Sequence, residues 1–216
     1  STSIKGEHCR KYLEKILPAV DSHTGKTIHS LWAQDYEPDE AMRKKLHAVL
    51  DKYLSAGLSK IEDYQKVHYT GEEKVIVKQS LVNEAKADLE QALKICALLH
   101  RDKNINRILE LIEIEKHSML YNAIEMIEME LPRKTAKDII RLFDFILDPV
   151  SFHKTGAEEE STNIFNRVQA GDDFSYNAWT KSLVMYCSWK NNIEEDIKTL
   201  QPIVSPHEEF IIAETR

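Results

Sequence analysis

Apolar residues recur at steps of three and four along two long stretches of the chain, at about residues 38–67 and 70–100. This spacing is typical of an amphipathic α-helix with one apolar stripe. Two helices of this length joined by a tight turn form an antiparallel hairpin, in which each buries its stripe on the other. The stripe of the first is Met42, Leu46, Val49, Leu50, Tyr53, Leu54, Ile61, Tyr64 and Val67; that of the second is Leu81, Ala85, Leu89, Ala92, Cys96 and Leu99.

Local signals refine the two long helices. Pro38 and the acidic residues after it open the first one. Gly57 interrupts it at a cost of about 1 kcal/mol relative to alanine, so the pattern predicts a kink or break there. Thr70 precedes Glu73 by three residues. This is the spacing of a capping box, which predicts the start of the second helix.

Shorter helical patterns fill the rest of the chain, and no strand pattern is present. They lie at about residues 6–17, 26–34, 105–114, 118–131, 135–147, 162–169, 174–190 and 193–204, and a last one begins at 207. The positions expected to face inward are Ile108, Leu111, Ile112, Ile139, Phe143, Ile146 and Leu147. Residues 151–161 are polar and predict a loop. Short helices in series are typical of an α-solenoid, so we expect an all-α fold in one continuous domain with segments 1–37, 38–101 and 102–216.

Composition narrows the class of protein. The 216 residues include 29 Lys plus Arg, 36 Asp plus Glu, 6 Gly and 6 Pro, for a formal net charge of −7. An acidic chain repels phosphate backbones, which disfavours nucleic acid as a partner. No stretch has the roughly 20 apolar residues of a membrane span, and no signal peptide is recognisable. The odd number of cysteines, Cys9, Cys96 and Cys187, predicts buried reduced thiols and a cytoplasmic location.

The motifs that suggest catalysis are incomplete. Gly25–Thr27 lacks the earlier glycine of a phosphate-binding loop, because Val20 stands there. His100–Asp102 resembles a kinase catalytic loop, but Arg107 replaces the required Asn. No second histidine follows His207 at the spacing of a zinc-protease helix. The sequence therefore nominates no catalytic, cofactor-binding or metal-binding residue, and we expect a protein that is not an enzyme and has no cofactor.

One aromatic group stands out as a candidate surface. Trp179 and Tyr186 are seven residues apart on one helical face, which predicts that both pack in the core. Trp189 lies off that face. It is the one residue that we single out for binding a partner.

Several segments carry a resemblance to a known family. The helix Ala92–Leu99 is followed by a further helix and then by Tyr121–Pro132. This order resembles the HEAT-repeat region that follows the membrane part in bacterial relatives of the ATP/ADP carrier (nucleotide translocase) proteins. Trp179–Tyr186 resembles a later repeat helix, and His207–Thr215 resembles the start of one more repeat, cut short. The resemblance covers about residues 80–216 and implies a HEAT-like α-solenoid preceded by the long hairpin.

The resemblance also implies a role. The chain lacks transporter helices and a cyclic-nucleotide-binding module, and an insertion at about 154–161 interrupts the repeat length. We therefore expect a non-catalytic interaction or scaffold domain, the cytoplasmic part of a transporter-like membrane protein tethered to the inner membrane. Its partner would be a protein or the rest of its own larger chain. Phe210–Ile212 would allow self-association, and ATP or ADP would bind no better than about millimolar.

Two alternatives remain open at this point. A HEAT-like nucleic-acid repair enzyme would need Lys and Arg on a concave face. Only Arg43–Lys45 and Arg133-Lys134 are dense basic clusters. A free-standing adaptor with a protein partner is the second alternative.

Overall fold

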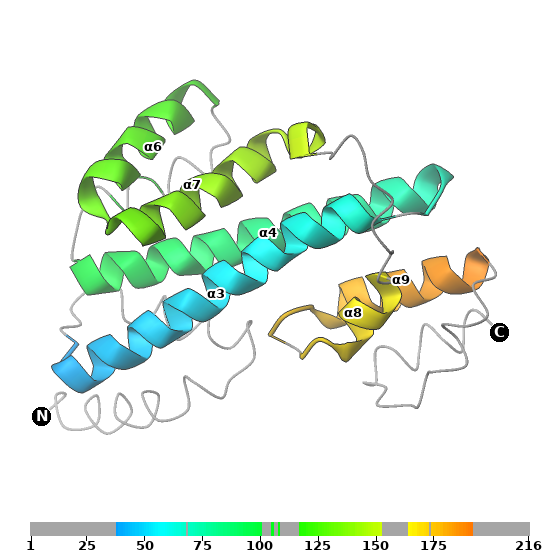
Figure 1. The fold of residues 1–216 in the computed structure, drawn as a ribbon, viewed down its shortest axis with the longest axis horizontal. Helices are drawn as coiled ribbons and strands as arrows, with labels where there is room; N and C mark the ends of the chain where they lie inside the picture. The colour runs from blue at the N-terminus through cyan, green and yellow to red at the C-terminus, as the bar shows by residue number, and fades with distance from the viewer. Residues whose placement is uncertain are drawn as a thin grey trace, which may run out of the picture. The chain divides into compact units, whose positions relative to one another are not determined.

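The computed structural model describes residues 38–67, 69–100, 105, 108, 117–152, 164–172 and 174–191, and every regular element in these ranges is helical (Figure 1). The elements are α3 (Glu40–Lys66), α4 (Gly71–His100), α6 (His117–Glu130), α7 (Arg133–Leu147), the 3₁₀ helix η2 (Pro149–Phe152), α8 (Ile164–Ala170) and α9 (Ala178–Lys190). The all-α prediction is confirmed for this part of the chain. The helices predicted at 6–17, 26–34 and 193–204, the segment from 207 and Cys9 lie outside the described residues.

Helix α3 forms where the sequence predicts it, and of the kink or break expected at Gly57 the break does not occur. The side chain of Asp39 caps the first turn, because its Oδ1 accepts a hydrogen bond from Met42 N at 2.8 Å. The helix then runs through Gly57 without interruption. Leu54 and Ile61, on either side of the glycine, are 3% and 1% exposed. Their burial outweighs a helix penalty of about 1 kcal/mol.

Helix α4 also begins where predicted. Gly71 is its first residue and has φ of +62°. Glycine adopts this left-handed conformation without the steric cost of a side chain. Glu73, which the capping-box spacing directs toward Thr70, forms an ion pair with Lys190 of α9. The acidic first turn therefore also contributes to tertiary structure.

The described residues fall into two compact units. The first contains residues up to 55 and from 87 to 143, and the second contains residues 56–86 and those from 144 onward. Each unit therefore takes a part of both long helices. In the first unit, α6 and α7 form a hairpin across Leu131 and Pro132 (Figure 1). The division of the chain into three consecutive segments remains a prediction.

Burial agrees only in part with the predicted cores of the shorter helices: Ile146 and Leu147, at the end of α7, are half-buried, and Leu111 and Ile112 lie outside the described residues. Ile108, Ile139 and Phe143 are between 0% and 2% exposed. Cys96 and Cys187 are free and buried, as expected. None of the described helices combines the length and apolar character needed to cross a membrane. The helix predicted from residue 174 begins four residues later, at Ala178, because residues 174–176 form a turn.

Aromatic side chains fill part of the second unit. The ring of Phe145 meets Tyr64 and Phe152 edge to face, at centroid distances of 5.2 and 5.6 Å. Gln65 Nε2 donates a hydrogen bond to the carbonyl of Phe152 at 2.6 Å. These contacts hold η2 and the end of α7 against the second half of α3.

Candidate functional site

The candidate site is the outward surface of α9, and its position depends on how firmly α9 is capped. Asn177 is the N-cap: its Oδ1 accepts a hydrogen bond from Thr180 N at 2.8 Å. Its own N–H donates to both carboxylate oxygens of Glu84 in α4, at 3.3 and 3.4 Å. At the other end, Asn191 N and Nδ2 both donate to the carbonyl of Cys187, at 3.1 and 2.8 Å. Both ends of the helix are therefore fixed.

The inward face of α9 is joined to α4 and to Tyr69 by buried polar contacts. The hydroxyls of Thr180 and Ser80 are 2.6 Å apart, and those of Ser188 and Tyr69 are 2.8 Å apart. All four residues are 7% exposed or less. A buried hydroxyl pair holds its helices in one register, because sliding would leave both groups unpaired.

An ion pair lies at the C-terminal end of α9. Lys190 bonds to Glu73, and this contact lowers the pKa of Glu73 and raises that of Lys190. The Lys190 ammonium also lies 6.0 Å from the ring centroid of Tyr186, within cation–π range. The ion pair lies near the surface, where such pairs contribute little to stability. The two contacts place the Lys190 ammonium close to both Glu73 of α4 and the ring of Tyr186.

The outward face exposes two tryptophans. Trp179 is 62% exposed and Trp189 is 49% exposed. Leu183 and Tyr186 are half-buried beside them, and the rings of Tyr186 and Trp189 are 6.4 Å apart with a tilt of 39°. We call Trp179, Leu183, Tyr186, Trp189 and Lys190 the α9 surface. It is an aromatic stripe with a cation at one end.

The sequence predicted this surface only in part. Trp189, the one residue singled out for binding, is exposed. The prediction that Trp179 packs in the core is wrong, because most of its side chain faces solvent. Tyr186 is half-buried. The heptad spacing of Trp179 and Tyr186 predicts a core stripe, but the buried residues of α9 include Thr180, Val184, Cys187 and Ser188 instead.

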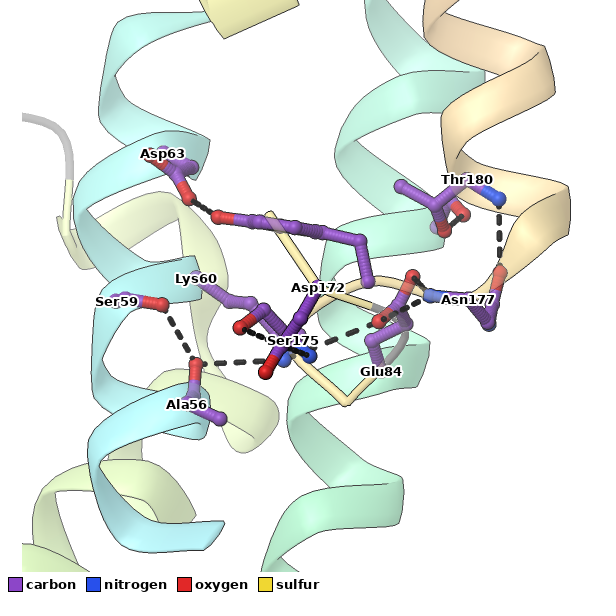
Figure 2. Close-up of polar contacts among 11 residues, drawn as sticks. Ala56, Ser59, Lys60, Asp63, Glu84, Asp172, Ser175, Asn177 and Thr180 are labelled. Carbon is purple, nitrogen blue, oxygen red and sulfur yellow. Dashed lines mark hydrogen bonds and ion pairs between the residues drawn. The ribbon is translucent and has the colours of Figure 1, made fainter. Parts of the chain in front are cut away.

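A second cluster of functional groups lies beneath the turn between α8 and α9 (Figure 2). Asp63 of α3 is fully buried, accepts a hydrogen bond from the Tyr176 hydroxyl, and has Arg167 Nε of α8 at 2.9 Å from its Oδ1. Lys60, one turn earlier in α3, is also fully buried. Its ammonium lies 3.8 Å from the Glu84 carboxylate and 3.3 Å from the Ala56 carbonyl. We call Lys60, Asp63, Glu84, Arg167 and Tyr176 the buried polar cluster.

Sequence reasoning missed this cluster, although a signal was present. Lys60 occupies the same helical stripe as Tyr53, Tyr64 and Val67, and Glu84 occupies the stripe of Val77 and Leu81. Charged residues at such positions are buried only when they are paired. Two of them with opposite charge on neighbouring helices indicate a buried ion pair. The contributions of Arg167 and Tyr176 come from distant parts of the chain and carry no local signal.

The thiols of the two described cysteines are held in their neutral form. Burial raises the pKa of Cys96 to about 12 and that of Cys187 to about 11, so neither thiol is ionised at neutral pH. Within the described ranges, no group of three or more His, Cys, Asp or Glu side chains could hold a metal ion. The charged residues of the buried polar cluster neutralise each other. This is the arrangement of a structural network.

Comparison with known proteins adds no relative: no family model, curated protein or solved structure matches the chain. The resemblance to HEAT-repeat regions therefore remains a hypothesis.

Proposed function

We propose that the chain is a non-catalytic helical interaction domain and that its partner, a protein, docks on the α9 surface. The observation that carries the proposal is the 62% exposure of Trp179 on a helix that is capped at both ends and tied down on its opposite face. Tryptophan is the residue type most enriched where alanine substitution costs binding energy. Contact of a large apolar side chain with water is unfavourable, and a partner that covers this side chain removes that cost.

The apolar area that the two tryptophans expose is sufficient to support binding. A tryptophan buries about 150–250 Å² when fully covered. Covering the exposed half of one ring at about 25 cal/mol per Å² contributes about 2–3 kcal/mol. Asn177 and the Thr180–Ser80 contact already order α9. Little of the free energy gained by covering the ring is therefore lost in ordering the helix on binding. Trp179 and Trp189 together would act as anchors of a modest interface.

The resemblance to HEAT-repeat regions and the pairing of helices support a more detailed proposal for the whole chain. The α6–α7 hairpin is joined by only two residues, as helix pairs of a HEAT-like solenoid are. We propose such a solenoid, preceded by the α3–α4 hairpin, as the arrangement of the whole chain. We also propose that it forms the cytoplasmic part of a larger membrane-tethered, transporter-like protein. A free-standing adaptor would use the α9 surface in the same way.

A nucleic-acid function has less support. Arg43, the first residue of one basic cluster, uses its Nη1 to donate a hydrogen bond to the Leu99 carbonyl at 3.2 Å. The chain as a whole has a net charge of −7. Binding to a phosphate backbone depends on many Lys and Arg side chains that can contact the phosphates. The α9 surface offers one lysine, and that lysine is paired with Glu73.

The proposal is tested by site-specific photocrosslinking in cells that produce the protein. A photoreactive phenylalanine analogue replaces Trp179 or Trp189, and in a control it replaces Met129, which is 84% exposed on α6. The proposal predicts one recurrent protein adduct from positions 179 and 189 that is absent from position 129. Equal labelling from all three positions, or no adduct at 179 and 189, would contradict it. Turnover of a substrate by the purified chain would contradict the non-catalytic part.

A further inference from the structure

Helix α7 exposes a row of cations along its solvent side. Arg133, Lys137 and Arg141 follow one another at steps of four residues and therefore lie on one face of the helix. Lys134 stands beside the first of them. All four residues are exposed, and we call them the α7 basic row. The opposite side of α7 is at most 4% exposed and includes Ala136, Ile139, Leu142 and Phe143. Packing of this buried side keeps the row directed toward solvent.

The positive charge of the row is not neutralised within the part of the chain that the structure describes. Lys60, Arg167 and Lys190 of the second unit each pair with a carboxylate. In contrast, no side chain of the α7 basic row takes part in a hydrogen bond or an ion pair in the described ranges. The chain as a whole has a net charge of −7. The row is therefore a local concentration of charge opposite in sign to that of the protein.

This arrangement of charges lowers the stability of the helix. Cations in the first turn of a helix are unfavourable, because the helix dipole is positive at that end. The first turn of α7 contains Arg133 and Lys134 and no acidic residue. Like charges four residues apart also repel each other, as in the pairs Arg133–Lys137 and Lys137–Arg141. A surface that destabilises its own helix indicates a role in binding rather than in folding.

We propose that the α7 basic row is the docking surface for an acidic helix of a protein partner, with carboxylates at steps of three and four residues along one face. The row is about 12 Å long, because Arg133 and Arg141 are eight residues apart on a helix that rises about 1.5 Å per residue. Asp or Glu side chains at the same spacing on a partner helix can pair with the row position by position. Each arginine can bind one carboxylate through two parallel hydrogen bonds.

The surroundings of the row favour a helix over a broader polyanion. Glu128 and Glu130, three to five residues before Arg133, are exposed on α6. These carboxylates would repel a flat anionic membrane or a nucleic-acid duplex that approached the row. A membrane-binding amphipathic helix also needs a free apolar face, and the apolar face of α7 is buried. A single acidic helix can contact the row alone.

The test is the binding of fluorescently labelled synthetic helical peptides to the full chain at low salt, measured by fluorescence anisotropy. One peptide carries glutamates at every fourth position along one face; the other has the same composition, with glutamates distributed around the helix. Lys137→Glu/Arg141→Glu alters the row, and Lys44→Glu/Lys45→Glu, at exposed positions of α3, is the control with the same change of net charge. Affinity for the first peptide falls at least about tenfold in the row variant and less than about twofold in the control.

The remaining outcomes decide between the possible ligands. The wild type binds the second peptide more weakly than the first. Equal affinity for the two peptides, no binding of the first, or an equal loss in the control variant overturns the proposal. Tighter binding to phosphatidylserine-containing vesicles or to duplex DNA, lost in the same row variant, also overturns it. Trp179→Ala/Trp189→Ala keeps the row and binds the first peptide as the wild type does, which separates this surface from the α9 surface; a loss of peptide binding there contradicts the proposal.

Thermal unfolding provides a measurement that needs no ligand. Lys137→Glu places a negative charge between Arg133 and Arg141 and raises the unfolding midpoint by about 2–4 °C, because two repulsive pairs become attractive. Lys44→Glu is the control and does not raise the midpoint, since Glu40 stands four residues before it. An unchanged or lower midpoint for Lys137→Glu would show that the row does not destabilise α7 and would overturn the proposal.

Discussion

Gly171 and the ring of Tyr176 lie so close together that a side chain at position 171 would force one of them to move. A Cβ atom at Gly171 would lie 2.5 Å from Cδ2 of Tyr176 and 2.9 Å from its Cε2. The tyrosine cannot give way easily, because its hydroxyl is bonded to Asp63 and its side chain is buried. Glycine at this position is what allows the turn to bring Tyr176 onto α3.

The substitution Gly171→Ala is therefore expected to destabilise the protein by about 1–3 kcal/mol, the usual cost of overpacking a filled site. Urea denaturation measures the change in the free energy of unfolding. Ala170→Ser, at the exposed neighbouring residue, is the control and changes stability by less than about 0.5 kcal/mol. Equal stability of Gly171→Ala and the wild type would show that the Tyr176 ring is not fixed in this position.

Substitutions at Ser80 and Thr180 test how α9 is held on α4. Ser80→Ala or Thr180→Val alone leaves one buried hydroxyl unpaired and is expected to cost about 1–3 kcal/mol. The double variant removes both hydroxyls and costs less than the sum of the two single changes. A double-mutant cycle from urea denaturation gives the coupling energy. Strict additivity would mean that the two hydroxyls do not interact.

Lys60 and Glu84 provide a test of the buried polar cluster. Lys60→Met leaves the buried carboxylate of Glu84 without its ammonium and is expected to cost about 3–5 kcal/mol. Adding Glu84→Gln removes the uncompensated charge and restores part of the loss. Lys44→Met, at an exposed position of the same helix, is the control and has little effect. If the double variant were less stable than Lys60→Met, the ion pair would not be the source of the cost.

The titration of Lys78 is expected to make the stability of the protein depend on pH in the alkaline range. Burial against the ring of Tyr64, 4.3 Å from its ammonium, and the charge of Lys74 lower the pKa of Lys78 to about 8. The unfolded chain therefore binds the proton of this residue more tightly than the folded one. Between about pH 8 and 10.5, the stability of the wild type is expected to rise relative to that of Lys78→Met, which cannot titrate. If the stability of the wild type relative to Lys78→Met stayed constant over this range, or fell, the pKa of Lys78 would not be lowered.

The sequence predicts the positions of the helices better than it predicts the contacts of side chains. The period of apolar residues is a local property, so α3, α4 and α7 are found close to their observed positions. The break expected at Gly57 does not occur, because burial of its neighbours, a tertiary effect, outweighs a local helix penalty. The exposure of Trp179 does not follow from the sequence, because periodicity identifies an apolar stripe but not whether another element covers it. Contacts such as Tyr176–Asp63 join residues 113 positions apart and have no local trace.

The central claim is that the α9 surface binds a protein partner through its two tryptophans. Its most direct test is the dissociation constant of the crosslinked partner, purified and titrated calorimetrically against the wild type, Trp179→Ala/Trp189→Ala and the control Met129→Ala. Two anchors that each contribute about 2 kcal/mol predict at least a hundredfold weaker binding by the double variant, with an unchanged fold by circular dichroism. Met129→Ala binds as the wild type does. Equal affinity of the double variant and the wild type would contradict the claim.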